Sequence, residues 1–341
     1  MKHSVKYDEI KHITVENDCG MKAEFSAYGA SIYNIWIKNN EGVYESMVLT
    51  PSLLSDFYTN TSYHGKTIGR YSGRIDKGIC EINNIKYNLD INWNNVNSLH
   101  GGFNGLSSKV FEYVVLPVDD CIDILFWVNE NDNILGGNAL YNITYRISKN
   151  YNTITIFLNA TCDIDTIMNL TNHTYFNLSG NCKNTILNHK LYLPCNKYTR
   201  LNNELITLSI DEVDKITDFR EKHEIGLYIE DPTLQNHTSK GYDHCFIKEN
   251  PNDDLTAILE DSLSGNRLTI SSSYPSVVFY SGCYPDSFKF NEEKLDNIKY
   301  HALCLEPQFI PNGINMTGVD KAILKANTDY RHYIKFEFSK I

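Results

Sequence analysis

The sequence has no long apolar run and no surplus of basic residues. Its 341 residues include 31 Lys and Arg against 42 Asp and Glu, which gives a formal net charge of −11 at pH 7. A chain without a Lys/Arg stripe has little with which to neutralise phosphates, so we expect no nucleic-acid partner. The N-terminal stretch MKHSVKYDEIKH lacks the apolar core of a signal peptide, and no later stretch reaches membrane-spanning length. We therefore expect a cytoplasmic protein that does not bind a membrane.

Paired metal-binding and disulfide motifs are also missing. The nine cysteines are scattered without a C-x-x-C pair, and the 11 histidines form no H-x-H or H-x-x-x-H pair. These absences argue against a zinc ribbon and against a disulfide framework. We expect the cysteines to be small buried or half-buried thiols.

Helical periodicity is scarce, whereas alternation of apolar and polar residues is frequent. Short runs rich in β-branched and aromatic residues predict strands, for example at 121–128, 141–148, 152–162, 267–273, 276–284 and 331–339. Turn residues separate such runs, at 83–84, 149–152 and 264–266. The only helical signals are weak: Thr50 is a candidate cap for a turn or two through 51–58, and 211–230 has room for one or two more.

The strand pattern continues from near residue 12 to residue 339 without a linker rich in Pro, Gly or Ser. No strand–helix–strand rhythm of parallel α/β units is present. We therefore predict an all-β protein, with a single antiparallel domain over residues 1–341 and few short helices.

Two segments hold the strongest candidates for chemistry. TNHTYFNL at 171–178 places His173 among hydrogen-bonding side chains, and LEPQFIPNGIN at 305–315 places Glu306 near the end of a predicted strand. Alternation in HALCLEPQF puts Ala302, Cys304 and Glu306 on one face, where the small residues would leave space for a ligand. A histidine and a carboxylate in one cleft can exchange protons with a neutral organic substrate. On position alone, however, a buried structural histidine and a surface glutamate ion pair fit as well.

Other polar residues are flanked by Gly or aromatic residues. They are His100 in NSLHGG (97–102), Asp243 and His244 in GYDHCF (241–246), and Arg70 and Arg74 in GRYSGRI (69–75). Such groups make directional hydrogen bonds to hydroxyls, and aromatic rings stack on the apolar face of a sugar. The set suits a carbohydrate and suits other polar small molecules too.

Taken in order, these segments resemble the aldose 1-epimerase family, the galactose mutarotases. The matching pieces also include DFR (218–220) and FYSG (279–282), so the resemblance spans nearly the whole chain. It implies a large antiparallel β supersandwich with an open active-site cleft. It also implies interconversion of the α and β anomers of a free aldohexose, without a metal or an organic cofactor.

By motif position, the resemblance implies that Glu306 is the general base and His173 the general acid. His100, Asp243 and Arg74 would bind the sugar. The only partner we expect is a small-molecule sugar, bound by a monomer or a homodimer.

This chain departs from the family pattern in the residues around that pair. Gly73 stands where the family usually has Asn, Val278 where it often has Gln, and Asn312 where it has Asp; 129–140 replaces an acidic loop containing Gly and Pro. Losing a hydrogen bond to a sugar hydroxyl costs on the order of 1 kcal/mol, so two losses would weaken binding about ten- to a hundredfold. We therefore hypothesise that the preferred sugar is not galactose, or that galactose binds weakly.

Three other functions remain open from the sequence. A sugar-binding or sensory protein could keep the fold without catalysis, although it would not need an acid–base pair. A hexose-6-phosphate 1-epimerase would need a cationic cluster, for which Arg70, Arg74 and Arg220 are the candidates. A metal enzyme could use His100, His173, Asp243 and Glu306 as ligands, although their spacing does not favour it.

Overall fold

Three antiparallel sheets make up most of the protein, and the computed structural model describes residues 2–6, 11–283, 289–290 and 298–341. The five-stranded sheet has the order β1 (Lys2–Lys6), β2 (His12–Glu16), β3 (Met21–Ser26), β4 (Ser31–Lys38), β5 (Tyr44–Ser46). The nine-stranded sheet has the order β11 (Glu112–Val118), β12 (Cys121–Asn131), β13 (Asn138–Ser148), β14 (Thr153–Cys162), β28 (Tyr330–Lys340), β24 (Asn266–Ser272), β23 (Leu255–Asp261), β18 (Lys190–Tyr192), β21 (His223–Glu224). The six-stranded sheet has the order β17 (Tyr175–Phe176), β26 (Leu303–Gln308), β25 (Ser276–Tyr280), β22 (Asp243–Lys248), β19 (Cys195–Leu201), β20 (Thr207–Glu212).

Smaller elements connect these sheets. Two-stranded ladders join β10 (Ser98–Leu99) to β7 (Arg74–Ile75), β15 (Thr166–Ile167) to β27 (Ile323–Leu324), β16 (Thr171–Asn172) to β6 (Thr67–Ile68), and β8 (Ile79–Ile82) to β9 (Ile85–Asn88). The described helices are α1 (Leu54–Thr59), α2 (Pro232–Gln235) and the single 3₁₀ turns η1 (Asp76–Gly78), η2 (Leu106–Ser108), η3 (Ile186–Asn188), η4 (Ile225–Tyr228) and η5 (Gly313–Asn315). None of these described helices is long and apolar enough to cross a bilayer.

The prediction of an all-β protein with few short helices is confirmed. Predicted strands appear as β12, β13, β14, β24, β25 and β28, although β25 ends at Tyr280 and residue 284 of the predicted strand lies outside the described residues. Asn83 and Asn84 form the hairpin turn between β8 and β9, with φ values of 51° and 63°. Two consecutive positive φ angles are typical of type I′ turns, which asparagine tolerates well.

The predicted helix start at Thr50 is wrong. Helix α1 begins at Leu54, and the residue before it, Leu53, makes no side-chain capping bond. The chain is still extended at Pro51, which pairs with Phe290, while the Ser52 amide donates to the Lys289 carbonyl. Pairing with this distant segment therefore delays the helix. In the other helical candidate, 211–230, the structure has the single turn η4, and α2 follows just beyond it.

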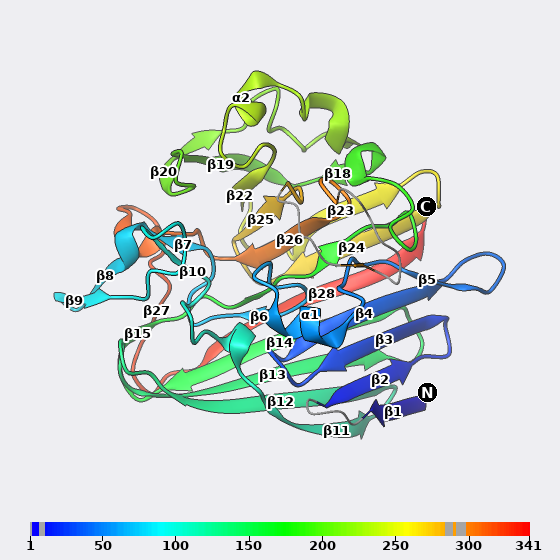
Figure 1. Cartoon of the computed structure of the whole chain (residues 1–341), viewed down its shortest axis with the longest axis horizontal. Coiled ribbons are helices and arrows are strands. Elements are labelled where there is room, and N and C mark those ends of the chain that lie inside the picture. The colour runs from blue at the N-terminus through cyan, green and yellow to red at the C-terminus, as the bar shows by residue number, and fades with distance from the viewer. Residues whose placement is uncertain (1, 7–10, 284–288, 291–297) are drawn as a thin grey trace.

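The main core lies between the sheets. In the view of Figure 1, the five-stranded sheet lies in front of strands β12–β14 of the nine-stranded sheet. The six-stranded sheet lies higher in the same view. Phe25 of β3 packs on Tyr145 of β13 with ring centroids 4.9 Å apart, and the Tyr145 hydroxyl donates to the Ala30 carbonyl at 2.6 Å. Strict alternation of buried and half-buried residues in β13 and β14 produces this contact face. One core thus draws on strands from both ends of the described chain, while a single domain over 1–341 stays a prediction.

Candidate active site

A cleft of about 280 Å³ lies over one face of the six-stranded sheet. Its floor comes from β26, β25 and β22, and its walls come from the loops that carry Tyr63, Trp93 and His100. The residues that line it include all five predicted site residues, Arg74, His100, His173, Asp243 and Glu306. Segments more than 200 residues apart in the sequence therefore meet in one place.

Glu306 occupies the cleft floor because of its place on β26. The strand is buried along its whole length, and Glu306 pairs in register with Val278 of β25. The glutamate is only 2 % exposed. Burial and the nearby Asp243 raise the pKa of Glu306 well above its usual range, against an opposing effect of Arg74.

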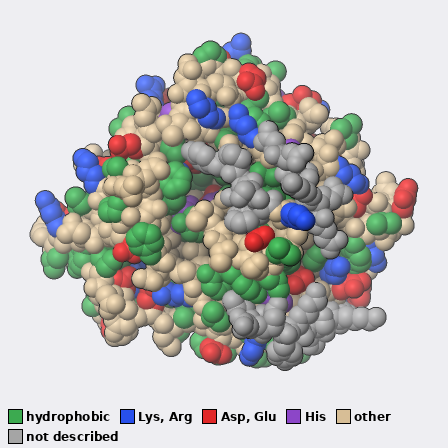
Figure 2. Space-filling model, in the orientation of Figure 1, with side chains coloured by type: hydrophobic (Ala, Val, Ile, Leu, Met, Phe, Trp, Pro, Cys, Tyr) green, Lys and Arg blue, Asp and Glu red, His purple; other side chains and the backbone are tan. Residues whose placement is uncertain are grey.

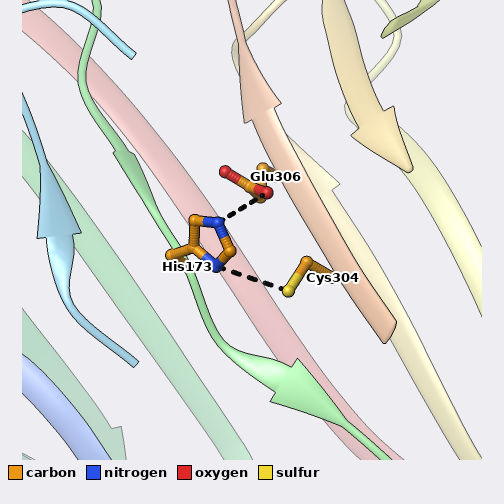
Figure 3. A group of neighbouring side chains, drawn as sticks. All are labelled: His173, Cys304 and Glu306. Carbon is orange, nitrogen blue, oxygen red and sulfur yellow. Dashed lines mark hydrogen bonds and ion pairs between the residues drawn. The ribbon is translucent and has the colours of Figure 1, made fainter. Parts of the chain in front are cut away.

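His173 lies opposite Glu306, on the short connection between β16 and β17. Its Nε2 is 3.4 Å from Glu306 Oε1, and Figure 3 shows the ring directed at the carboxyl group. Tyr175 stacks on the imidazole with centroids 5.1 Å apart. Burial and then the charge of His64 lower the pKa of His173 to about 3. Both shifts favour the neutral forms of the two groups, so a proton in the contact favours Glu306 over His173.

Arg74 and Asp243 form a second polar pair in the cleft. Arg74 begins β7 and Asp243 begins β22, and their Nη1 and Oδ2 atoms are 3.3 Å apart. The guanidinium carbon lies 4.7 Å from the Trp93 ring centroid. The aromatic ring and the carboxylate together hold the arginine side chain against the cleft wall.

His100 follows β10 directly and has a positive φ of 52°. Its Nδ1 accepts a hydrogen bond from the Gly73 amide at 3.2 Å. Burial, followed by the neighbouring His173 and Arg74, lowers the pKa of His100 well below its usual range. A neutral imidazole that accepts at Nδ1 carries its proton on Nε2, where it is a hydrogen-bond donor.

Some polar atoms that line the cleft are buried without a hydrogen-bond partner among the described residues. They are Glu306 Oε2, Arg74 Nε and Gln308 Oε1. Each such atom lowers the free energy of unfolding by roughly 1–3 kcal/mol unless a ligand or water pairs with it. Two acceptors and one donor in a single cleft are the complement of a ligand with several hydroxyl groups.

The three departures from the family pattern lie in different surroundings. Gly73 has a φ of +79°, and a Cβ on it would lie 2.6 Å from the Pro311 ring, so an asparagine would require Pro311 to shift. Asn312 does not line the cleft; its Oδ1 accepts from the Asp76 amide and from Asn315. Val278 does line the cleft and presents an apolar surface beside Glu306.

Arg70, His244 and Arg220, named above as candidates, lie outside the cleft lining. Arg70 is buried and hydrogen-bonded to other parts of the fold, and exposed Arg220 pairs with Asp218 at 2.7 Å. His244 alternates with Asp243 on β22 and packs near Tyr198 and His237 instead. Among the described lining residues, Arg74 is the only Arg or Lys, so these residues do not form the cationic cluster that a phosphate needs. On the face drawn in Figure 2, the visible Lys and Arg side chains are scattered among acidic ones.

Sequence reasoning missed two roles on β26. Cys304 was expected to leave space beside Glu306, but its sulfur lies 3.4 Å from His173 Nδ1. Gln308 was not singled out, yet it lines the cleft and is 1 % exposed. Strand alternation already placed both residues on the face of Glu306. What the alternation could not provide was the position of the imidazole.

The possible metal ligands that the structure brings together differ from the set that the sequence left open. Within the described part of the chain, the group that could hold an ion is His173, Cys304 and Glu306, rather than one that includes His100 and Asp243. The sulfur and the carboxylate lie at opposite nitrogens of a single imidazole (Figure 3). One ion cannot replace both contacts, because it can bind only one ring nitrogen.

Comparison with known proteins identifies the family. The sequence matches the family model of aldose 1-epimerase over residues 11–337. A galactose mutarotase from Mus musculus is 27% identical over 322 residues, covering 94% of this chain and 91% of that protein. An aldose 1-epimerase from Streptococcus thermophilus is 29% identical over 343 residues, covering 97% and 94%.

Solved structures share the same fold. The crystal structure of a galactose 1-epimerase from Lactobacillus acidophilus has a TM-score of 0.87 at 24% identity and covers 99% of each chain. An aldose epimerase homologue from C. elegans has a TM-score of 0.84 at 24% identity, covering 97% of this chain and 99% of its own. The antiparallel fold and the resemblance found in the sequence are thus confirmed, and the chain belongs to the aldose 1-epimerase family of isomerases.

Proposed function

We propose that the protein interconverts the α and β anomers of a free aldohexose by opening and closing the pyranose ring. The observation that carries this proposal is the contact of 3.4 Å between His173 Nε2 and Glu306 Oε1 at the floor of the cleft. A single proton shared by two such groups is what the reaction requires, because it takes a proton from one sugar oxygen and gives one to another.

Sugar binding would move the shared proton. A hydroxyl that donates to the unpaired Glu306 Oε2 stabilises the carboxylate, so the proton passes to His173 Nε2. The carboxylate then removes the proton of the anomeric hydroxyl while the imidazolium protonates the ring oxygen. The C1–O5 electron pair goes to O5, and a C1=O1 double bond forms.

Ring closure reverses these steps on the other face of the aldehyde. After rotation about C1–C2, His173 takes the proton back from the O5 hydroxyl as that oxygen attacks C1, and Glu306 returns a proton to O1. Both residues are then as they were before opening. No covalent intermediate forms, and no proton is gained or lost over the cycle.

The remaining cleft residues would hold the hydroxyl groups while the ring is open. Arg74 offers an unpaired Nε, Asp243 a carboxylate, and His100 an Nε2–H donor. Trp93 and Tyr63 supply aromatic surface at the wall. Keeping the open chain in one register favours closure to the same sugar.

The sugar preference follows from the apolar patch at Val278. We propose that galactose is not the preferred sugar, or binds weakly, because valine offers no hydrogen bond there. Gln308 on the adjacent strand would supply an amide from another direction, because it also lines the cleft and has a free oxygen. A saturation curve with tight, galactose-selective turnover would contradict this part of the proposal.

Polarimetry tests the proposed activity. Freshly dissolved α-D-galactose, α-D-glucose and other aldoses are followed with wild-type protein and with the Glu306→Gln variant. Acceleration that the variant abolishes supports the epimerase. Unchanged sugar affinity in a wild type that does not accelerate mutarotation would instead favour the binding or sensory function.

The cell compartment and the assembly state belong to the same proposal. We propose a cytoplasmic location, which is supported by nine cysteines that all remain free thiols. We propose that the protein acts as a monomer or a homodimer. Light scattering on the purified protein distinguishes the two.

A further inference from the structure

Cys304 and Glu306 contact opposite nitrogens of the same imidazole. The Cys304 sulfur lies 3.4 Å from His173 Nδ1, and Glu306 Oε1 lies 3.4 Å from Nε2. Figure 3 shows both side chains reaching the ring from the same strand, β26. They are two residues apart, so strand alternation places them on one face at the spacing that the ring spans.

We propose that Cys304 is a positioning residue, which accepts the Nδ1–H of His173 and so leaves Nε2 free to exchange a proton with Glu306 and the sugar. This inference rests on the proposed function, in which only Nε2 changes its protonation. Throughout that cycle Nδ1 must keep its hydrogen, and a hydrogen needs an acceptor. Among the described residues, the side chain within hydrogen-bond distance of Nδ1 is that of Cys304.

The sulfur suits this role because it is neutral. Cys304 is fully buried, and burial together with Glu306 and Asp243 raises the pKa of its thiol well above the usual range. A carboxylate at Nδ1 would stabilise the imidazolium and make it a weaker acid. A neutral, weak acceptor fixes the tautomer without that stabilisation, so the imidazolium gives its proton readily to the ring oxygen.

Stacking supplies the rest of the orientation. Tyr175 lies against the imidazole with an interplanar angle of 27°, and it pairs in register with Cys304 across β17 and β26. The stacked ring limits tilting, whereas the sulfur decides which nitrogen is protonated. The two contacts therefore act on different degrees of freedom of the imidazole.

The test combines NMR with kinetics on the full chain. Protein carrying ¹⁵N-labelled histidine is recorded at pH 7, and the His173 signals are identified by their loss in His173→Gln. We expect the Nδ1–H tautomer in the wild type, a mixture of tautomers in Cys304→Ala, and recovery in Cys304→Ser, whose hydroxyl can accept. For Cys304→Ala we also expect kcat to fall about fivefold with little change in KM, as for the loss of one hydrogen bond.

Cys80→Ala is the matched control, because Cys80 is also fully buried but packs in the smaller core away from the cleft. It should lose similar packing and leave the His173 tautomer unchanged. The proposal is overturned if wild-type His173 is the Nε2–H tautomer, or if Cys304→Ala keeps the wild-type spectrum and kcat. A stoichiometric metal ion that binds wild type and is lost in Cys304→Ala would overturn it too. Because the NMR readout needs no turnover, absence of mutarotase activity would contradict the proposed function alone.

Discussion

Two arginines of the same motif, Arg70 and Arg74, have opposite environments although only three residues separate them. Arg70 donates to the Tyr141 hydroxyl, to Thr166, to the Gly136 carbonyl and to Glu130. Within the described part of the chain, Arg74 has one carboxylate contact, at 3.3 Å, and an Nε without a partner. Arg70, which is buried in the fold, has its hydrogen-bond donors paired. Arg74, which faces the cleft, has a donor that is not paired within the described residues.

The same contrast separates two glutamates, Glu130 on β12 and Glu306 on β26. Glu130 accepts from Arg70 at 3.0 Å, from the Tyr141 hydroxyl at 2.9 Å and from Lys109 at 3.0 Å. Glu306 has one oxygen beside His173 and the other unpaired. Unpaired buried polar atoms lower stability, so their accumulation in one cleft marks a site that is completed by a ligand.

The largest expected effect comes from exchanging the two glutamates for their amides. Glu306→Gln should lower kcat about 10²–10⁴-fold, because the proposed base is lost, and should not lower stability. Glu130→Gln should keep the turnover of the folded protein and lower the free energy of unfolding, because Arg70 loses its charged partner. Polarimetry measures kcat of both variants, and chemical unfolding measures their free energy of unfolding. Equal losses of activity in the two would contradict the distinction.

The two arginines provide the next test. Arg74→Met should raise KM about ten- to a hundredfold and change stability by less than about 1 kcal/mol, because it removes contacts to the sugar. Arg70→Met should cost about 3–5 kcal/mol of stability, because Glu130, Tyr141 and Thr166 all lose a hydrogen-bond donor. KM is measured by polarimetry under conditions in which both variants are folded. Stability is measured as the midpoint of urea unfolding. A stable Arg70→Met variant would mean that the paired network is not structural.

The pH dependence tests the single shared proton. Because the pKa of His173 is lowered to about 3 and that of Glu306 is raised, the pair keeps one proton across the range between these values. Activity should fall about tenfold per pH unit below about 3, where a second proton binds, and again above the raised pKa of Glu306, where the last proton leaves. The measurement is kcat/KM after subtraction of the uncatalysed mutarotation. An acid limb near pH 6.5 would show that His173 is not held neutral in the free protein.

The smallest effect concerns the apolar patch. Gln308→Met should raise KM about fivefold without lowering the melting temperature, because the unpaired Oε1 makes no internal hydrogen bond. Val278→Gln should lower KM for galactose by a similar factor, because it restores an amide at the cleft floor. Both are measured with galactose and glucose in parallel. A structural role for Gln308 would instead appear as a lower melting temperature with unchanged KM.

Much of the fold was predictable because its signals are local. Alternation identified the long strands β12, β13, β14 and β28, and paired asparagines identified the hairpin turn at 83–84. The start of α1 was missed because Pro51 pairs with Phe290, far away in the sequence. Local capping signals do not include such competition.

The motifs by themselves indicated the family and brought five residues into one predicted site, and the tertiary structure collected all five in one cleft. Residue type and alternation alone did not separate Arg70 from Arg74, or Asp243 from His244. The resemblance named Arg74 and Asp243, and these two line the cleft. Only the folded chain decided that Cys304 reaches His173, that Pro311 fills the space beside Gly73, and that His173 and Glu306 are both buried. Pairing, burial and pKa depend on neighbours from distant strands, and these neighbours exist only once the sheets have assembled.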